Sequence, residues 1–258
     1  MKTLAEICSN EYDTLESLKQ LESELALLRM NGYMLFFRGE ADVAYKLKPS
    51  IVRNYIYNRN VELKMLKEFK KIAQKYGWDK NKFPSIDDNL YYMGMARHLG
   101  INSRLLDWTT GIWTAMSFMT HNEEKIEKDG CLWILAVPNR EIDNYSDPMQ
   151  IEDDNIHVFK APYYGNFISE LPIGNLRCFM QSGAFTSVAD KYLDIPLDKF
   201  PNLQNSEILL QSILINKELK NTFRKSQSYK AKSQLVLEKL PDDIEKMVKH
   251  LNGYIKVE

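Results

Sequence analysis

Residues 97–113 read RHLGINSRLLDWTTGIW and place charged side chains and tryptophans among leucines and isoleucines. Arg104 and Asp107 lie three residues apart, close enough to pair in a turn or a helix, and Asp107 could equally orient His98 or cap an element that begins near Thr109. Buried polar groups need partners, and matched partners are commonest at pockets. The stretch therefore predicts either a binding site or the buried polar seam of a small domain.

Each residue of this stretch also has a structural interpretation. Asp107 is predicted to be buried and to accept hydrogen bonds from Arg104, Arg97 or backbone N–H groups, because a buried carboxylate needs partners to stay charged. Trp108 offers a face on which a base or a nicotinamide could stack, although a tryptophan beside leucines more often belongs to the core. His98 could act as an acid or base or bind a ribose, although a single histidine is more often structural.

Two further clusters could contribute to the same site. Arg38 follows a run of apolar and aromatic residues, and Gly39 after it permits a close approach of the backbone, so Arg38 could hold a phosphate or a carboxylate with two hydrogen bonds. The alternative is an ion pair that joins two elements. Arg177 and Gln181 would share one face of a strand. We expect Arg38, residues 98–109 and Gln181 to converge on one cleft.

The composition restricts the class of protein. The 258 residues carry a formal net charge of -1, which gives no overall attraction to nucleic acid or to an anionic membrane. Three widely spaced cysteines predict neither a disulfide scaffold nor a metal site and favour a reducing compartment, the cytoplasm. No signal peptide, membrane span, phosphate-binding loop, dinucleotide fingerprint or metalloprotease motif is evident.

Hydrophobic periodicity predicts a mixture of helices and strands. Helices are expected at 12–30, 61–77, 86–99, 112–125 and from Pro241 to Gly253, and strands at 33–40, 131–138, near Val158, within 176–189 and at 207–215. Without a repeat or a composition break, this order predicts a single α+β domain, with a helical N-terminal extension over 1–32 and a domain with a small β-sheet core over 33–258.

Four segments in this order resemble the FRG domain, a family of bacteria and their phages that is named for a Phe-Arg-Gly motif. They are FFRGEADVAYKLKPSIVRN, MARHLGINSRLLDWTTGIWTAMSF, KDGCLWIL and LRCFMQSGAF. The resemblance covers residues from about 33 to about 251. Within the central motif, this chain has Arg97 where the family usually has Gln, Asn102 where it has Pro, and Ser103 where it has Thr.

An aromatic-Arg-Gly strand is also similar to the first motif of ADP-ribosyltransferases, in which the arginine contacts NAD and a late Glu or Gln stabilises the ribosyl cation. This similarity implies an ADP-ribosyltransferase-like fold and an NAD-using effector of toxin or phage-defence systems, acting on a protein or nucleic-acid acceptor. It implies catalytic roles for Gln181 and His98, and NAD contacts from Arg38, Gly39, Arg104, Asp107, Trp108 and Thr109. A neutral Gln should stabilise the cation less than a carboxylate does. The alternative is a non-catalytic module that binds a nucleotide or a protein through this pocket, without a membrane or a metal.

Overall fold

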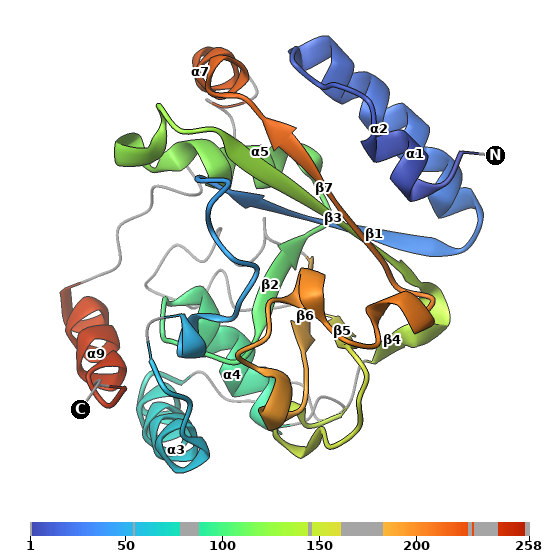
Figure 1. Cartoon of the computed structure of the whole chain (residues 1–258). Coiled ribbons are helices and arrows are strands. Elements are labelled where there is room, and N and C mark those ends of the chain that lie inside the picture. The colour runs from blue at the N-terminus through green and yellow to red at the C-terminus, as the bar shows by residue number, and fades with distance from the viewer. Residues whose placement is uncertain are drawn as a thin grey trace.

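The computed structural model describes residues 2–53, 55–77, 88–143, 146–160, 183–226, 229 and 242–255. Within these residues the fold is α+β, with one mixed sheet in the order β4-β5-β6-β2-β1-β3-β7 (Figure 1). The strands are β1 (Tyr33–Glu40), β2 (Leu106–Thr109), β3 (Gly130–Pro138), β4 (Ile142–Asp143), β5 (His157–Lys160), β6 (Gly183–Ser187) and β7 (Leu209–Ile215). The predicted fold class is confirmed.

The helices lie on both sides of this sheet. They are α1 (Leu4–Cys8), α2 (Leu15–Met30), α3 (Arg59–Lys75), α4 (Asp88–His98), α5 (Ile112–His121), α7 (Lys217–Lys225) and α9 (Asp242–Asn252). Figure 1 shows α2, α5 and α7 toward one end of the molecule and α3, α4 and α9 toward the other. No helix of the described residues combines the length and the apolar character that crossing a bilayer requires.

β1 is an inner strand next to β2, the middle strand of the sheet, and its neighbours determine where the polar residues meet. β1 pairs with β3 along its whole length, from Tyr33 opposite Pro138 to Glu40 opposite Cys131. On its other edge, β1 meets the short β2 at a single pair, Phe37 opposite Thr109. The strands that carry Arg38 and Asp107 are therefore adjacent in the middle of the fold.

Leucine spacing explains the position of α2. Leu18, Leu21, Leu25 and Leu28 are three or four residues apart, so they lie on one face of the helix, and all four are buried in a core shared with β1, β3 and α5. The helix begins with a capping box at Thr14 and ends before Gly32, whose positive φ of 84° favours glycine. The expected N-terminal helix therefore packs directly on the sheet.

Most of the predicted elements are present, and the differences have local reasons. The predicted helices and strands correspond to α2, α3, α4, α5, α9, β1, β3, β5, β6 and β7. The sequence analysis did not predict β2 as a strand, because four residues with Leu106 and Trp108 buried are too short to show an alternating pattern. It also did not predict α1, α7 and β4, which are short. Residues 176–182 of the predicted late strand lie outside the described residues.

Candidate functional site

A cavity of about 210 Å³ opens beside the centre of the sheet, between β1, β2, α5 and the end of α4. We call it the Arg–Asp pocket. Its lining consists of Phe37, Arg38, Gly39, Arg97, His98, Gly100, Asp107, Trp108, Thr109 and Phe118. Arg38 therefore lines one cavity with His98, Gly100, Asp107, Trp108 and Thr109 of the 98–109 motif, as predicted, whereas Arg104 of that motif does not line it. Gln181 lies outside the described residues, so its place in this arrangement stays a prediction.

Asp107 connects the two arginines of the pocket. Its Oδ1 accepts hydrogen bonds from Arg38 Nη1 at 2.8 Å and from Arg97 Nε at 2.9 Å. Burial alone would raise the pKa of the carboxyl, but the charges of Arg97 and Arg38 outweigh burial and hold that pKa well below its usual range. The expected pairing with Arg97 is confirmed. Asp107 is only partly buried, less than predicted, because 30% of the side chain is exposed where β2 borders the cavity.

Arg38 is held on two sides by carboxylates. Its Nε donates to Glu40 Oε1 at 2.7 Å, and its Nη1 donates to both Asp107 Oδ1 and the Asp107 main-chain oxygen at 2.8 Å. Burial would lower the pKa of the guanidinium, but Glu40 and Asp107 raise it above its ordinary value. Among the described residues, Nη2 makes no hydrogen bond. Arg38 therefore forms the ion pairs of the structural alternative, which join β1 to β2, and it also lines the pocket. Its contact with a ligand stays a prediction.

The structure shows why position 39 requires a glycine, which the sequence did not reveal. A Cβ atom at this position would lie 2.1 Å from the main-chain oxygen of Ala115 in α5. Such a contact is far closer than atoms can approach without displacing the helix. The absence of a side chain thus lets α5 pack against β1, whatever Gly39 contributes to ligand binding.

The remaining lining residues form the walls of the pocket. Trp108 is 3% exposed, and its Nε1 donates to Thr186 Oγ1 at 3.0 Å, so the indole is part of the core as well as a wall. The ring of His98 is buried and lies 5.6 Å from the ring of Phe185. Thr109 is also buried, and its hydroxyl accepts a hydrogen bond from the Gly111 backbone. The walls are therefore aromatic and rigid.

Arg104, which the sequence analysis placed with these residues, belongs to a different cluster. Its side chain is fully buried, and it binds Glu62 Oε2 at 2.7 Å and Asp190 Oδ1 at 2.8 Å through Nη2, besides the hydroxyl of Tyr57. Its Nη1 donates to the Pro148 main-chain oxygen at 3.1 Å. It does not line the Arg–Asp pocket. We call Arg104, Glu62, Asp190 and Arg59 the Arg104 cluster.

Two participants were not assigned to the site from the sequence. Arg97 was considered only as a partner of Asp107, although it lines the cavity and immediately precedes His98 at the end of α4. Glu40 was not considered, although it completes the binding of Arg38 two residues away on β1. The signal for Glu40 was available, because residues i and i+2 of a strand share a face.

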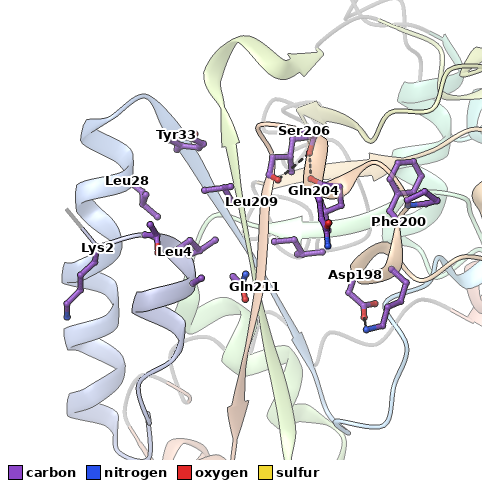
Figure 2. A pocket seen from close by; sticks show the side chains of 17 residues that line it. Lys2, Leu4, Leu28, Tyr33, Asp198, Phe200, Gln204, Ser206, Leu209 and Gln211 are labelled. Atoms are coloured by element: carbon purple, nitrogen blue, oxygen red, sulfur yellow. Dashed lines mark hydrogen bonds and ion pairs between the residues drawn. The ribbon is translucent and has the colours of Figure 1, made fainter.

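A second and larger cavity, of about 860 Å³, lies along β7 (Figure 2). Residues of α1 and α2 line one side and residues 198–206 line the other. Its charged side chains pair locally, Lys2 with Glu24 at 3.3 Å and Lys199 with Asp198 at 3.6 Å. Within the described ranges, no group of three or more acidic, histidine or cysteine residues is placed to hold a metal ion. The Arg–Asp pocket is thus the better candidate, because its two arginines and its carboxylate come from β1, α4 and β2.

Comparison with known proteins gives one result for this region. The model of the FRG domain matches residues 34–128, whereas no curated protein and no solved structure matches the chain. Every residue that lines the Arg–Asp pocket lies inside the matched segment, and every residue that lines the larger cavity lies outside it. Residues 34–128 of the chain therefore belong to the FRG domain family, and they supply the whole lining of the Arg–Asp pocket.

Proposed function

We propose that this FRG domain binds NAD, with the nicotinamide end of the dinucleotide in the Arg–Asp pocket. The observation that carries the proposal is the combination of Arg38, Arg97 and an ionised Asp107 beside the aromatic walls of one cavity. The nicotinamide ring of NAD is cationic and aromatic, and a ribose and the phosphates follow it. Such a ligand needs a carboxylate and an aromatic surface near the ring and ribose, and arginines near the phosphates. No element of the proposal depends on a metal.

The size of the cavity limits how much of the ligand it encloses. Pockets that enclose a drug-sized molecule usually measure roughly 300–1,000 Å³. The Arg–Asp pocket, at about 210 Å³, is smaller than this. One end of a dinucleotide would therefore enter the cavity, and the remainder would lie along its mouth.

Each group of the pocket has a defined task in this proposal. Asp107 Oδ1 is occupied by the two arginines, which leaves Oδ2 to accept a hydrogen bond from a ribose hydroxyl or to face the cationic ring. Trp108 and Phe118 supply the aromatic surface. Arg97 is 18% exposed and adds positive charge on the side where phosphates would lie.

The activity that we propose is ADP-ribosyl transfer by an effector protein. In that reaction, the bond between C1′ of the ribose and the nicotinamide nitrogen breaks, and neutral nicotinamide leaves with the bonding electron pair. A nucleophilic atom of a protein or nucleic-acid acceptor then bonds to C1′ and loses its proton to a base. His98 is the base in this proposal, and Gln181 stabilises the ribosyl cation.

One observation favours a second candidate, a non-catalytic module that binds a nucleotide. Among the described residues, Asp107 is the only carboxylate that lines the pocket, and it is already paired with two arginines. A carboxylate whose charge is shared in this way stabilises a ribosyl cation less strongly than one without cationic partners. The same pairing does not prevent Asp107 from binding a hydroxyl group.

Calorimetric titration with NAD tests the binding, and the release of nicotinamide tests the reaction. Arg97→Gln should weaken NAD binding by about tenfold or more, because it removes a charged contact beside the phosphates. Arg140→Gln is the matched control, since Arg140 is 67% exposed and pairs with Glu207 outside the pocket. If the wild-type chain binds no NAD at millimolar concentration, the proposal is wrong. Binding without nicotinamide release in the presence of candidate acceptors would select the non-catalytic module.

A further inference from the structure

The pairing around Arg38 extends beyond the pocket into a row of alternating charges. Glu40 Oε1 lies 2.7 Å from Arg38 Nε and 3.7 Å from Arg53 Nη2. Asp107 Oδ1 lies 2.8 Å from both Arg38 Nη1 and Arg97 Nη2. The order of the row is thus Arg53, Glu40, Arg38, Asp107 and Arg97. We call these five residues the ion-pair row.

The ion-pair row begins and ends with arginine, so three guanidinium groups face two carboxylates and one positive charge is in excess. Arg53 has the weakest internal partner, since Glu40 binds Arg38 a full 1 Å more closely (2.7 Å against 3.7 Å). Burial lowers the pKa of Arg53, and repulsion from Arg38 and Arg97 lowers it further. An added anion would therefore relieve the repulsion within the row.

The orientation of Arg53 leaves part of its guanidinium available. Its Nε donates to the Lys48 main-chain oxygen at 2.9 Å, which holds the side chain in place. Among the described residues, Glu40 at 3.7 Å supplies the only carboxylate within 4.0 Å of the two terminal nitrogens of Arg53. The side chain is 35% exposed, more than the 10% of Arg38 and the 18% of Arg97. Arg53 is thus a fixed cation that solvent can reach.

We propose that Arg53 binds a phosphate group of the ligand whose other end occupies the Arg–Asp pocket. The inference rests on the proposed function for the identity of that ligand and adds its chemical class, a phosphate-bearing molecule. Arg38 is a positioning residue in this arrangement, because two carboxylates already hold it. A planar guanidinium suits a phosphate because two parallel N–H groups meet two oxygens. Arg53 lies within residues 34–128, as the pocket does.

The test compares probes with and without phosphate on one variant. Arg53→Gln removes the charge and keeps a polar side chain, and Arg140→Gln is again the control at an exposed arginine. Calorimetry with inorganic pyrophosphate and with NAD should show binding weakened by about tenfold or more in Arg53→Gln. Nicotinamide riboside, which lacks phosphate, should bind the variant and the wild type within about twofold, since it has no phosphate oxygens for Arg53 to contact. The affinity of Arg53→Lys for pyrophosphate and NAD should lie between those of the wild type and Arg53→Gln, because lysine keeps the charge and loses the pair of parallel N–H donors.

The outcomes separate this inference from the proposed function. Equal binding of NAD and pyrophosphate to the wild type and to Arg53→Gln overturns the inference, while NAD binding that Arg97→Gln weakens would still support the function. Pyrophosphate binding that depends on Arg53, without any NAD binding, supports the phosphate site and rejects the function. If the wild type binds neither probe, both are wrong. If Arg53→Gln does not fold, Arg53→Lys is the deciding variant. An affinity for pyrophosphate equal to that of the wild type would then overturn the inference that two N–H groups of Arg53 bind a phosphate.

Discussion

Arg104 and Asp107 are three residues apart in the chain, yet they belong to two ion-pair clusters with different properties. In the Arg104 cluster, two arginines face two carboxylates, and the side chain of Arg104 is completely covered. In the ion-pair row, three arginines face two carboxylates, and Asp107 is 30% exposed beside a cavity. The first cluster has balanced charges around a buried Arg104–Glu62 pair, although Asp190 and Arg59 at its edge are 30% and 45% exposed. The second has one excess positive charge and borders a cavity.

This difference separates structural polar groups from those that can serve a ligand. The guanidinium of Arg104 is fully covered and matched by carboxylates, so the contacts that the structure shows for it are structural, and they join α3 to η7 (Asp190–Tyr192). A row with an unmatched charge next to a cavity can still gain from an added anion. Only some of the polar residues in the 97–113 stretch, Asp107 among them, therefore belong to the candidate binding site, and others, such as Arg104, have structural contacts.

The largest effect should come from removing the buried cation of the Arg104 cluster. Arg104→Ala would leave Glu62 and Asp190 without their shared cation, and we expect the free energy of unfolding to fall by about 3–5 kcal/mol. Chemical denaturation of both proteins measures this difference. Arg140→Ala is the control, and a change of about 0.5 kcal/mol or less is expected there because the residue is exposed. A loss of less than about 1 kcal/mol for Arg104→Ala would show that Arg104 and Glu62 do not form a buried ion pair.

The sequence predicted the helices and the long strands because their hydrophobic periodicity is local. It also predicted that Arg38 and the 98–109 motif would meet, which follows from the need to match buried polar groups. It could not separate Arg104 from Asp107, since the decisive fact is that β2 begins at Leu106 and directs the two side chains to different partners. The partners of Arg104, at Glu62 and Asp190, are 42 and 86 positions away, and no local pattern identifies contacts of that range.

A smaller loss of stability is expected in the ion-pair row. Asp107→Ala would remove the carboxylate that Arg38 and Arg97 share, but Arg38 keeps Glu40, and water can reach part of this site because the Asp107 side chain is 30% exposed. We therefore expect the free energy of unfolding to fall by about 2 kcal/mol, less than for Arg104→Ala. Denaturation in the same buffer provides the comparison. If Asp107→Ala costs more than Arg104→Ala, the distinction between a fully buried cation and a partly exposed carboxylate is wrong.

Double-mutant cycles test whether the two clusters are independent. Arg104 and Asp107 share no partner within the described residues, so the double variant Arg104→Ala/Asp107→Ala should equal the sum of the single effects within about 0.5 kcal/mol. Arg38→Gln and Asp107→Asn alter one ion pair, and their effects should depart from additivity by about 1 kcal/mol or more. Strong coupling between Arg104 and Asp107 would join the clusters into one network.

The pH dependence of stability should give the smallest difference and sharpen the account of the ion-pair row. The folded protein lowers the pKa of Asp107 below the value of about 3.9 that it has when unfolded, so in acid the unfolded chain binds the proton more readily. The stability that Asp107 contributes is thus fully present well above pH 4 and declines as the pH falls below it. Asp107→Asn mimics the protonated carboxyl, and its loss of thermal stability relative to the wild type should be constant from about pH 7 to pH 5 and shrink toward pH 3. Burial would raise the pKa of Asp190, but Arg59 and Arg104 lower it, so Asp190→Asn should show the same trend. A deficit of Asp107→Asn that grows in acid would mean that the two arginines do not stabilise the ionised carboxylate, and the positive row beside the pocket would lose its physical basis.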